Sequence, residues 1–162
     1  MKMDKITLER IKLLHPKVRE EALEIYEEIC KELTGKAICR FSHTLRTFAE
    51  QDALYAQGRT KPGSIVTNAR SGSSMHNYGL AIDIVLIDGK SASWDIKKDF
   101  DGDGKSDWME VVQIFKEYGW VWGGNWKFFD APHFEKSFGY SVRHLRNLHA
   151  TGKLDKNGYV II

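Results

Sequence analysis

The sequence predicts a single domain of the α+β class, with a small mixed sheet flanked by helices. The chain has 162 residues, which suits one domain with its own hydrophobic core. Amphipathic helical patterns and short apolar strand-like runs occur together, without the regular strand–helix alternation of a parallel sheet. No repeat or linker divides the chain. We expect N-terminal helices over 1–35, a core over about 36–140, and a C-terminal helix and strand over 141–162.

The first third of the chain predicts three helices and a strand. A short helix is expected over 7–14, and a second helix from Pro16, which suits a first helical turn, to a stop at Gly35. The apolar run 37–41 indicates a strand. Thr47 and Glu50 have the spacing of a capping box, which opens a third helix ending near Gln57.

The rest of the chain predicts a long polar loop over 59–78 and a central strand over 80–87. This strand is apolar on both faces, so it belongs in the middle of a covered sheet. Asp88-Gly89 is typical of a hairpin turn. The later elements that we expect are a helix over 107–118, a basic helix over 141–150 and a terminal strand.

Composition excludes several classes of protein. Hydrophobic residues make up 42% of the chain and charged residues 28%, as in a globular domain, and the net charge of +2 gives no argument for nucleic acid binding. We see no apolar signal segment and no stretch long enough to insert in a membrane, so we expect a protein made in the cytoplasm. We also expect the protein to be a monomer. Cys30 and Cys39 lie on apparent core faces, which argues against a Cys–His peptidase.

Asp83 interrupts the apolar central strand, and a buried carboxylate is costly unless a cation or strong donors compensate for its lost hydration. His76 lies at the mouth of this strand, and His133 follows Asp130 in the segment FDAPHFE. Two imidazoles and a carboxylate suit Zn²⁺, and they leave a fourth position for water, whose pKa zinc lowers to about 7. Asp130 is placed to accept a proton. Spacing alone is weak evidence, because the HxxxxxxD pattern is common and no HExxH helix is present.

The wider pattern resembles the M15 metallopeptidases, the group of D-Ala-D-Ala carboxypeptidase and VanY. The segment SMHNYGLAID, from Ser74 to Asp83, matches the SxHxxGxAxD signature of this family. The segment DAPH resembles the second element of the family. The segment HTLRTFAEQDALYAQGRTKPG resembles its upstream substrate-binding segment, and WVWGGNW resembles the aromatic run of its endolysin-type branch. The matches extend from about residue 6 to about residue 140. The resemblance implies a Hedgehog/DD-peptidase-like fold and a zinc peptidase that cuts the stem peptide of bacterial peptidoglycan.

The resemblance also implies roles for individual residues. His76, Asp83 and His133 correspond to the zinc ligands. Asp130 corresponds to the general base, at which many family members carry Glu. Arg46 corresponds to the residue that polarises the scissile carbonyl or binds a substrate carboxylate, a task that suits a permanently charged, planar guanidinium. The residues expected to contact the substrate are Arg46, Gln51, Ser74, Tyr78 and Trp126.

The endolysin-like pattern favours an L-alanyl-D-glutamate endopeptidase that reaches the cell wall by phage-type release. A D-alanyl-D-alanine carboxypeptidase is the alternative within the family. A zinc-containing module that only binds the cell wall is the alternative outside it, and the presence of Asp130 argues against this module. A serine-type DD-peptidase would need Ser-x-x-Lys, and no serine in the sequence has a lysine three residues later.

A second metal site is predicted in the stretch DFDGDGKSDWME, which fits the EF-hand loop template D-x-D-x-D-G-x5-E. Ca²⁺ takes hard oxygen ligands, and crowded charges of one sign repel unless a cation is present. The loop departs from the template in having Ser106 at the eighth position and no clear entering helix. The alternative is an acidic turn exposed to solvent. The candidate calcium ligands are Asp99, Asp101, Asp103, Asp107 and Glu110.

Overall fold

The computed structural model describes residues 2–162 and confirms the α+β class. In chain order, its elements are α1 (Lys5–Ile11), α2 (Pro16–Glu32), β1 (Ala37–His43), α3 (Phe48–Ala56), the 3-10 helix η1 (Met75–Tyr78), β2 (Ala81–Asp88), β3 (Ser91–Ser93), α4 (Asp107–Glu117), β4 (Val121–Trp122), the 3-10 helix η2 (Gly123–Asn125), β5 (His133–Glu135) and α5 (Val142–Ala150).

The strands form one sheet in the order β1-β2-β5-β4, and β3 also pairs with β2. Every pairing between these strands is antiparallel, so the expectation of a mixed sheet is wrong. The central position of β2 is confirmed, because it pairs with β1 on one side and with β5 and β3 on the other. The hairpin at Asp88-Gly89 is also confirmed: it joins β2 to β3, and Gly89 adopts a left-handed φ of 63°.

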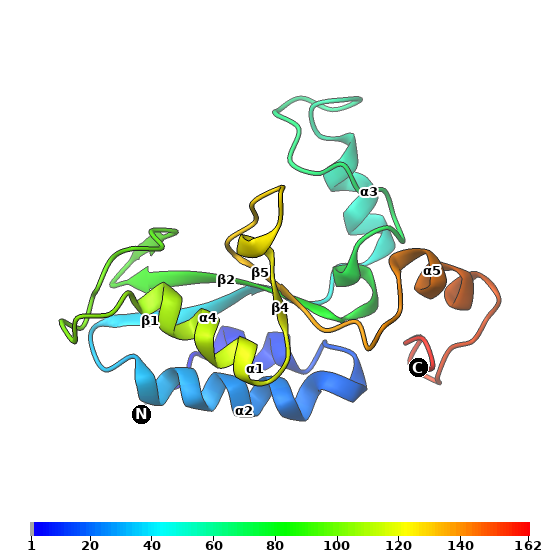
Figure 1. The fold of residues 1–162 in the computed structure, drawn as a ribbon. Helices are drawn as coiled ribbons and strands as arrows, with labels where there is room; N and C mark the ends of the chain where they lie inside the picture. Colours follow the sequence, from blue (N-terminus) through cyan, green and yellow to red (C-terminus); the bar gives the residue numbers. More distant parts are fainter. Residues whose placement is uncertain (1) are drawn as a thin grey trace.

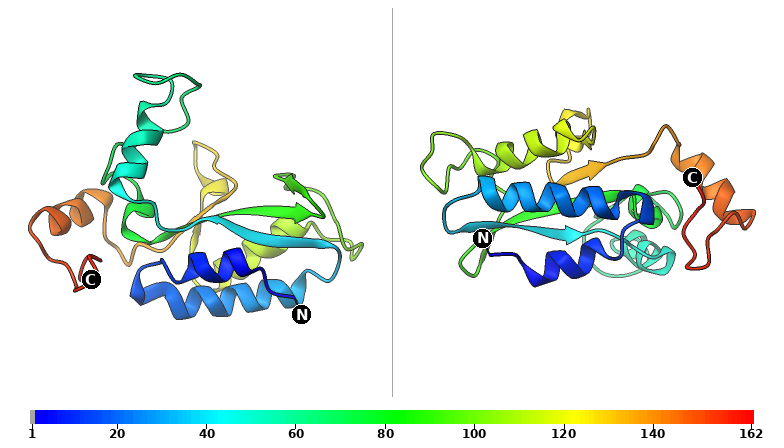
Figure 2. Two further views of the ribbon diagram at one scale, coloured as in Figure 1. Left: turned by 180° about the vertical axis from the view of Figure 1, so that it is seen from behind. Right: turned by 90° about the horizontal axis from the view of Figure 1, so that it is seen from below.

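The helices α1, α2 and α4 lie side by side against one face of the sheet (Figures 1 and 2). Ile82, Ile84 and Leu86 of β2 share one face by strand alternation, and all three are fully buried in the main core. Phe115 of α4 stacks on Phe134 of β5 with ring centroids 4.0 Å apart. No helix within residues 2–162 combines the length and apolar character needed to cross a bilayer.

The opposite face of the sheet carries two projections, α3 with the loop that follows it and the segment from η2 to β5 (Figure 1). The predicted capping box opens α3: Thr47 accepts a hydrogen bond from the backbone of Glu50, and the Glu50 carboxylate accepts one from the backbone of Thr47. Both projections rise from the face of the sheet that α1, α2 and α4 leave uncovered (Figure 1).

The expected terminal strand is absent from the described chain. Leu154 and Val160 form only an isolated bridge, because the segment turns back on itself. The Asp155 carboxylate accepts hydrogen bonds from the backbone of Asn157 and Tyr159, which closes the turn. Backbone groups of this segment therefore form hydrogen bonds within the segment itself.

Candidate metal centre and catalytic site

The sheet register brings three polar residues into one row. Asp83 of β2 lies opposite His43 of β1 on one side and opposite His133 of β5 on the other. The pairing of β1 with β2 is irregular between Phe41 and His43. Two residues that are 50 positions apart in the sequence, Asp83 and His133, thus become direct cross-strand neighbours.

His76 joins this row from the helical turn η1. Ser74 caps the turn, and its hydroxyl accepts a hydrogen bond from the backbone of His76. Gly79 ends the turn with φ 70°, a conformation that suits glycine, and leads the chain into β2. The imidazole Nδ1 of His76 lies 2.8 Å from the carbonyl oxygen of Thr44, which can only accept, so Nδ1 carries the proton.

The ring nitrogens of both histidines converge on one oxygen of Asp83. Nε2 of His76 and Nδ1 of His133 each lie 3.1 Å from Oδ1 of Asp83. Nε2 of His133 lies 2.8 Å from the carboxylate of Glu135, to which it donates its proton. In the neutral imidazoles, two lone pairs therefore point at a carboxylate oxygen. This arrangement is repulsive unless a further proton on an imidazole or a metal cation lies between the three groups, so the donor set fits a metal ion.

The pKa values in the site reflect the same charges. Burial opposes ionisation of Asp83, yet the hydrogen bonds from His133 and His76 hold its pKa well below the usual range. Burial also opposes the charge on His133, but its hydrogen bonds to Asp83 and Glu135 raise its pKa to about 9. A positive charge next to Asp83 is therefore strongly favoured.

Asp130 lies at the edge of this site, on the segment between η2 and β5. Its backbone N–H donates to the carbonyl of Gly123, and its own carbonyl accepts from the backbone of His133. A side chain at Gly123 would collide with Asp130 and His133, so glycine permits this close approach. Desolvation and the negative charge of Asp83 raise the pKa of Asp130.

Arg46 reaches the same region from the segment between β1 and α3. Its guanidinium donates to Oε1 of Gln51 at 3.2 Å. Gln51, which we expected to contact the substrate, has a fully buried side chain. Gln51 instead links Arg46 to the long loop, since its amide also donates to the carbonyl of Ala69. Gln51 thus orients the guanidinium of Arg46 through this hydrogen bond.

The other residues expected to contact the substrate divide into buried and exposed side chains. Tyr78 is buried and donates its hydroxyl to the carbonyl of Gly72. Ser74 is half-buried and uses its hydroxyl to cap η1. Trp126 is exposed, and its ring lies 5.1 Å from the ring of His133. Trp126 is therefore available at the rim of the site.

Sequence reasoning missed two residues of the site. Glu135 lies two positions after His133 on β5, which places both side chains on one face of the strand. The two-residue spacing of His133 and Glu135 in the segment PHFE is the sequence signal that could have identified Glu135. The second residue is His43, whose side chain is 59% exposed and whose Nδ1 lies 4.0 Å from Asp83. His43 and Arg46 line one wall of a cleft of about 370 Å³ beside α3.

The candidate calcium ligands gather at the other end of the sheet, where the chain enters α4. Carboxylate oxygens of Asp99, Asp101 and Asp107 lie within 4.8 Å of one another, as do those of Asp101, Asp103 and Glu110. The N-cap of α4 is Ser106. The cluster belongs to a region separate from the site around Asp83.

Comparison with known proteins points to peptidases. Residues 67–136 match the M15 peptidase family model described as D-alanyl-D-alanine carboxypeptidase. The chain is 50% identical over 125 residues to the peptidoglycan L-alanyl-D-glutamate endopeptidase CwlK of Bacillus subtilis, covering 75% of this chain and 72% of that protein. The L-Ala D-Glu endopeptidase ChiX of Serratia marcescens has a similar fold, with a TM-score of 0.55 and 21% identity over 85% of this chain and 91% of that chain.

Proposed function

Because the chain belongs to the M15 peptidase family, we propose that it is a zinc-dependent endopeptidase that hydrolyses the L-alanyl-D-glutamate bond in the stem peptide of bacterial peptidoglycan. One observation carries the proposal: His76, Asp83 and His133 converge on a single point, and Asp130 lies beside them. CwlK, which is 50% identical to this chain over the aligned residues, is named as an L-alanyl-D-glutamate endopeptidase.

We assign His76, Asp83 and His133 as the residues that hold zinc. The geometry that supports this assignment is the pair of imidazole nitrogens at 3.1 Å from Asp83 Oδ1, each with its other nitrogen engaged by an acceptor. Such acceptors fix the tautomer of a metal-binding histidine. When bound, zinc supplies a Lewis acid that polarises the scissile carbonyl and lowers the pKa of a water molecule.

The chain's own residues supply the remaining chemistry. Asp130 accepts the proton of the attacking water and passes it to the amine of the leaving D-glutamate residue. The guanidinium of Arg46, held by Gln51, stabilises the negative charge that develops on the carbonyl oxygen or binds a carboxylate of the substrate. Both roles require that these charged groups face the bond being cut.

The stem peptide would lie across the site between α3 and the segment that carries Asp130. The cleft beside α3 is lined by His43, Arg46 and Gln57 among others, and Trp126 stands exposed next to His133. Glu50 also lines this cleft, and the guanidinium of Arg46 offers a planar, permanently charged group that suits a carboxylate such as that of D-glutamate. An exposed tryptophan offers a flat surface for the peptide.

Digestion of purified peptidoglycan tests the bond that is cut. We expect mass spectrometry of the products to show new N-terminal D-glutamate. The family description as D-alanyl-D-alanine carboxypeptidase makes that reaction the second candidate. Loss of terminal D-alanine without new N-terminal D-glutamate would establish this alternative, and binding of peptidoglycan without any cleavage would indicate a module that only binds.

Glu135 offers a test of the metal assignment that does not depend on turnover. Glu135→Gln removes the charge that accepts the proton of His133 Nε2. We expect zinc affinity to fall about 10- to 100-fold, as for other groups that orient metal-bound histidines. Competition with a chromophoric chelator measures this affinity. The control is Glu117→Gln, on α4, which should leave the affinity unchanged, and equal affinities for all three proteins would contradict the assignment.

A further inference from the structure

A cluster of five carboxylates lies where the chain enters α4. Oxygens of Asp99, Asp101 and Asp107 lie within 4.8 Å of one another, and so do oxygens of Asp101, Asp103 and Glu110. Asp101 belongs to both groups, so the five side chains surround one region. These are the carboxylates at the first, third, fifth, ninth and twelfth positions of the loop. Acidic side chains alone do not make a metal site, and the case depends on how two of them are buried.

Asp107 and Glu110 are buried with unpaired oxygens. Asp107 has no exposed surface, and Glu110 is 7% exposed. Within residues 2–162, Oδ2 of Asp107 and both carboxylate oxygens of Glu110 have no hydrogen-bond partner. Leaving a buried charge without a partner is strongly unfavourable. Asp107 and Glu110 each contribute a carboxylate oxygen to one of the two converging groups. For Glu110 this oxygen is unpaired whichever of the two it is, because both lack a partner, so it lies where a cation would bind.

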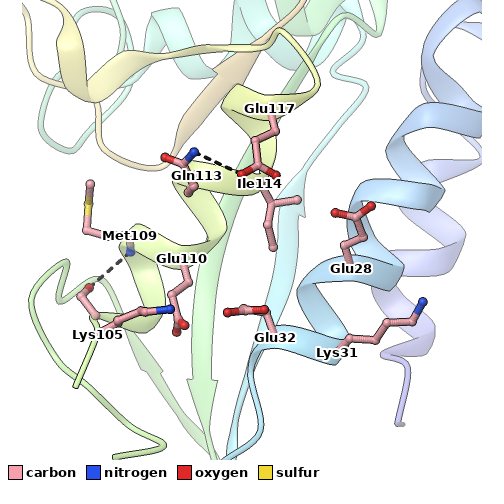
Figure 3. Close-up of a pocket in the computed structure, with 10 residues that line it drawn as sticks. Glu28, Lys31, Glu32, Lys105, Met109, Glu110, Gln113, Ile114 and Glu117 are labelled. Atoms are coloured by element: carbon pink, nitrogen blue, oxygen red, sulfur yellow. Dashed lines mark hydrogen bonds between the residues drawn. The ribbon is translucent and has the colours of Figure 1, made fainter. Parts of the chain in front are cut away.

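The surroundings of Glu110 add negative charge. Figure 3 shows Glu32 of α2 pointing toward Glu110 across the space between α2 and α4, with Lys105 beside Glu110. This space is a cavity of about 600 Å³. Burial and the carboxylates of Asp103, Asp101 and Glu32 raise the pKa of Glu110 to about 8. Without a cation, these crowded carboxylates repel one another.

The loop also holds its outer carboxylates in fixed positions. Asp99 accepts hydrogen bonds from the backbone of Gly102 and Gly104 at 2.6 and 2.8 Å. Asp101 accepts from the backbone and hydroxyl of Thr34, both at 3.2 Å, which ties the loop to the end of α2. These neutral donors orient the carboxylates and leave their charge uncompensated.

We propose that Asp99, Asp101, Asp103, Asp107 and Glu110 bind one calcium ion. Hard carboxylate oxygens in an irregular loop suit Ca²⁺, which accepts six to eight oxygens in flexible geometry. Mg²⁺ demands a near-ideal octahedron of shorter bonds and gives up its water reluctantly, so a site with this many carboxylates disfavours it. The ion supplies the charge that the buried oxygens of Asp107 and Glu110 lack.

The position of the site gives it a structural role near the catalytic strand. Trp108 follows Asp107 in the first turn of α4, and its indole N–H donates to the carbonyl of Ala131 at 3.3 Å. Ala131 lies between Asp130 and His133. Calcium would fix the first turn of α4 and, through Trp108, the segment that carries the proposed base and the third zinc ligand.

Calcium titration of the full-length, zinc-loaded chain tests the proposal without an activity assay. The protein is first dialysed against calcium-depleted buffer, and its zinc content is checked. We expect saturable heat of binding by calorimetry, and a melting temperature that rises by about 5 to 10 °C when calcium reaches a hundredfold excess over its dissociation constant. Magnesium at the same concentrations should give a smaller shift.

Substitution of Glu110 separates calcium binding from the general effect of acidic charge. In Glu110→Gln, we expect the calcium-dependent shift to be largely lost, and the melting temperature without calcium to equal or exceed that of the unsubstituted chain, because a buried charge has been removed. Asp95→Asn, an exposed aspartate outside the cluster, should keep the full shift.

Three results would overturn the proposal. The first is no saturable heat and no shift up to about 10 mM calcium, which exceeds the range of weak extracellular calcium modules. The second is a full shift in Glu110→Gln. The third is an equal loss of the shift in Asp95→Asn. These outcomes leave the zinc peptidase proposal untouched, because the site around Asp83 takes no part in the measurement.

Discussion

Substituting Asp130 with Asn is expected to lower kcat about 10²- to 10⁴-fold, the usual contribution of a positioned general base, while the protein keeps its zinc. The amide has the shape of the carboxylate and cannot accept the proton of the attacking water. Asp130 is three residues from His133 and is not one of the converging metal ligands, so zinc content should stay at one ion per chain.

The pH dependence of the unsubstituted chain gives a second readout of the same residue. A base must be ionised to act. Because the pKa of Asp130 is raised, we expect that, as the pH falls, activity is lost at a higher pH than it would be with an aspartate of ordinary pKa. The residual activity of Asp130→Asn should lack this acidic limb. A variant that keeps its zinc and cleaves at the unsubstituted rate would show that another group accepts the proton.

Asp83→Asn is expected to lose zinc and to lower activity on the order of 10³-fold or more. A metal Lewis acid is worth several kcal/mol, and each 1.4 kcal/mol is tenfold in rate. The neutral amide cannot replace the charge that lies 3.1 Å from both imidazoles. Zinc content by atomic emission and hydrolysis of a stem peptide are measured on the same sample.

The matched control for this substitution is Asp88→Asn, at the far end of the same strand. Asp88 lies opposite Ala37 and Ser91 and away from the two histidines. It should keep both zinc and activity, which excludes a general effect of removing an aspartate from β2. Normal zinc content in Asp83→Asn would exclude Asp83 as a ligand.

Local sequence signals predicted the elements that carry the site. The capping pair Thr47 and Glu50 marked α3, and the apolar run around Asp83 marked the central strand. Both patterns are properties of neighbouring residues, and for that reason they can be read without the fold. The terminal strand was predicted wrongly, because Asp155 closes a local turn through its side chain, and a short apolar run does not reveal such a turn.

The partners that orient the site depend on tertiary contacts. Thr44 acts through its carbonyl, which every residue possesses, so no sequence pattern could identify it. Gln51 was expected to contact the substrate, and only the fold shows that its side chain is fully buried and accepts a hydrogen bond from Arg46. His43 came close to Asp83 through the register of β1 with β2, which composition does not reveal.

Zinc titration of the metal-stripped, full-length chain, assayed on a peptide that contains the L-alanyl-D-glutamate bond, tests the central claim most directly. The site formed by His76, Asp83 and His133 predicts negligible hydrolysis before zinc is added, followed by a linear rise that stops at one equivalent of zinc per chain. Full hydrolysis by the stripped chain, or zinc binding at one equivalent without any hydrolysis, would contradict the assignment of this site as the catalytic centre of a zinc peptidase.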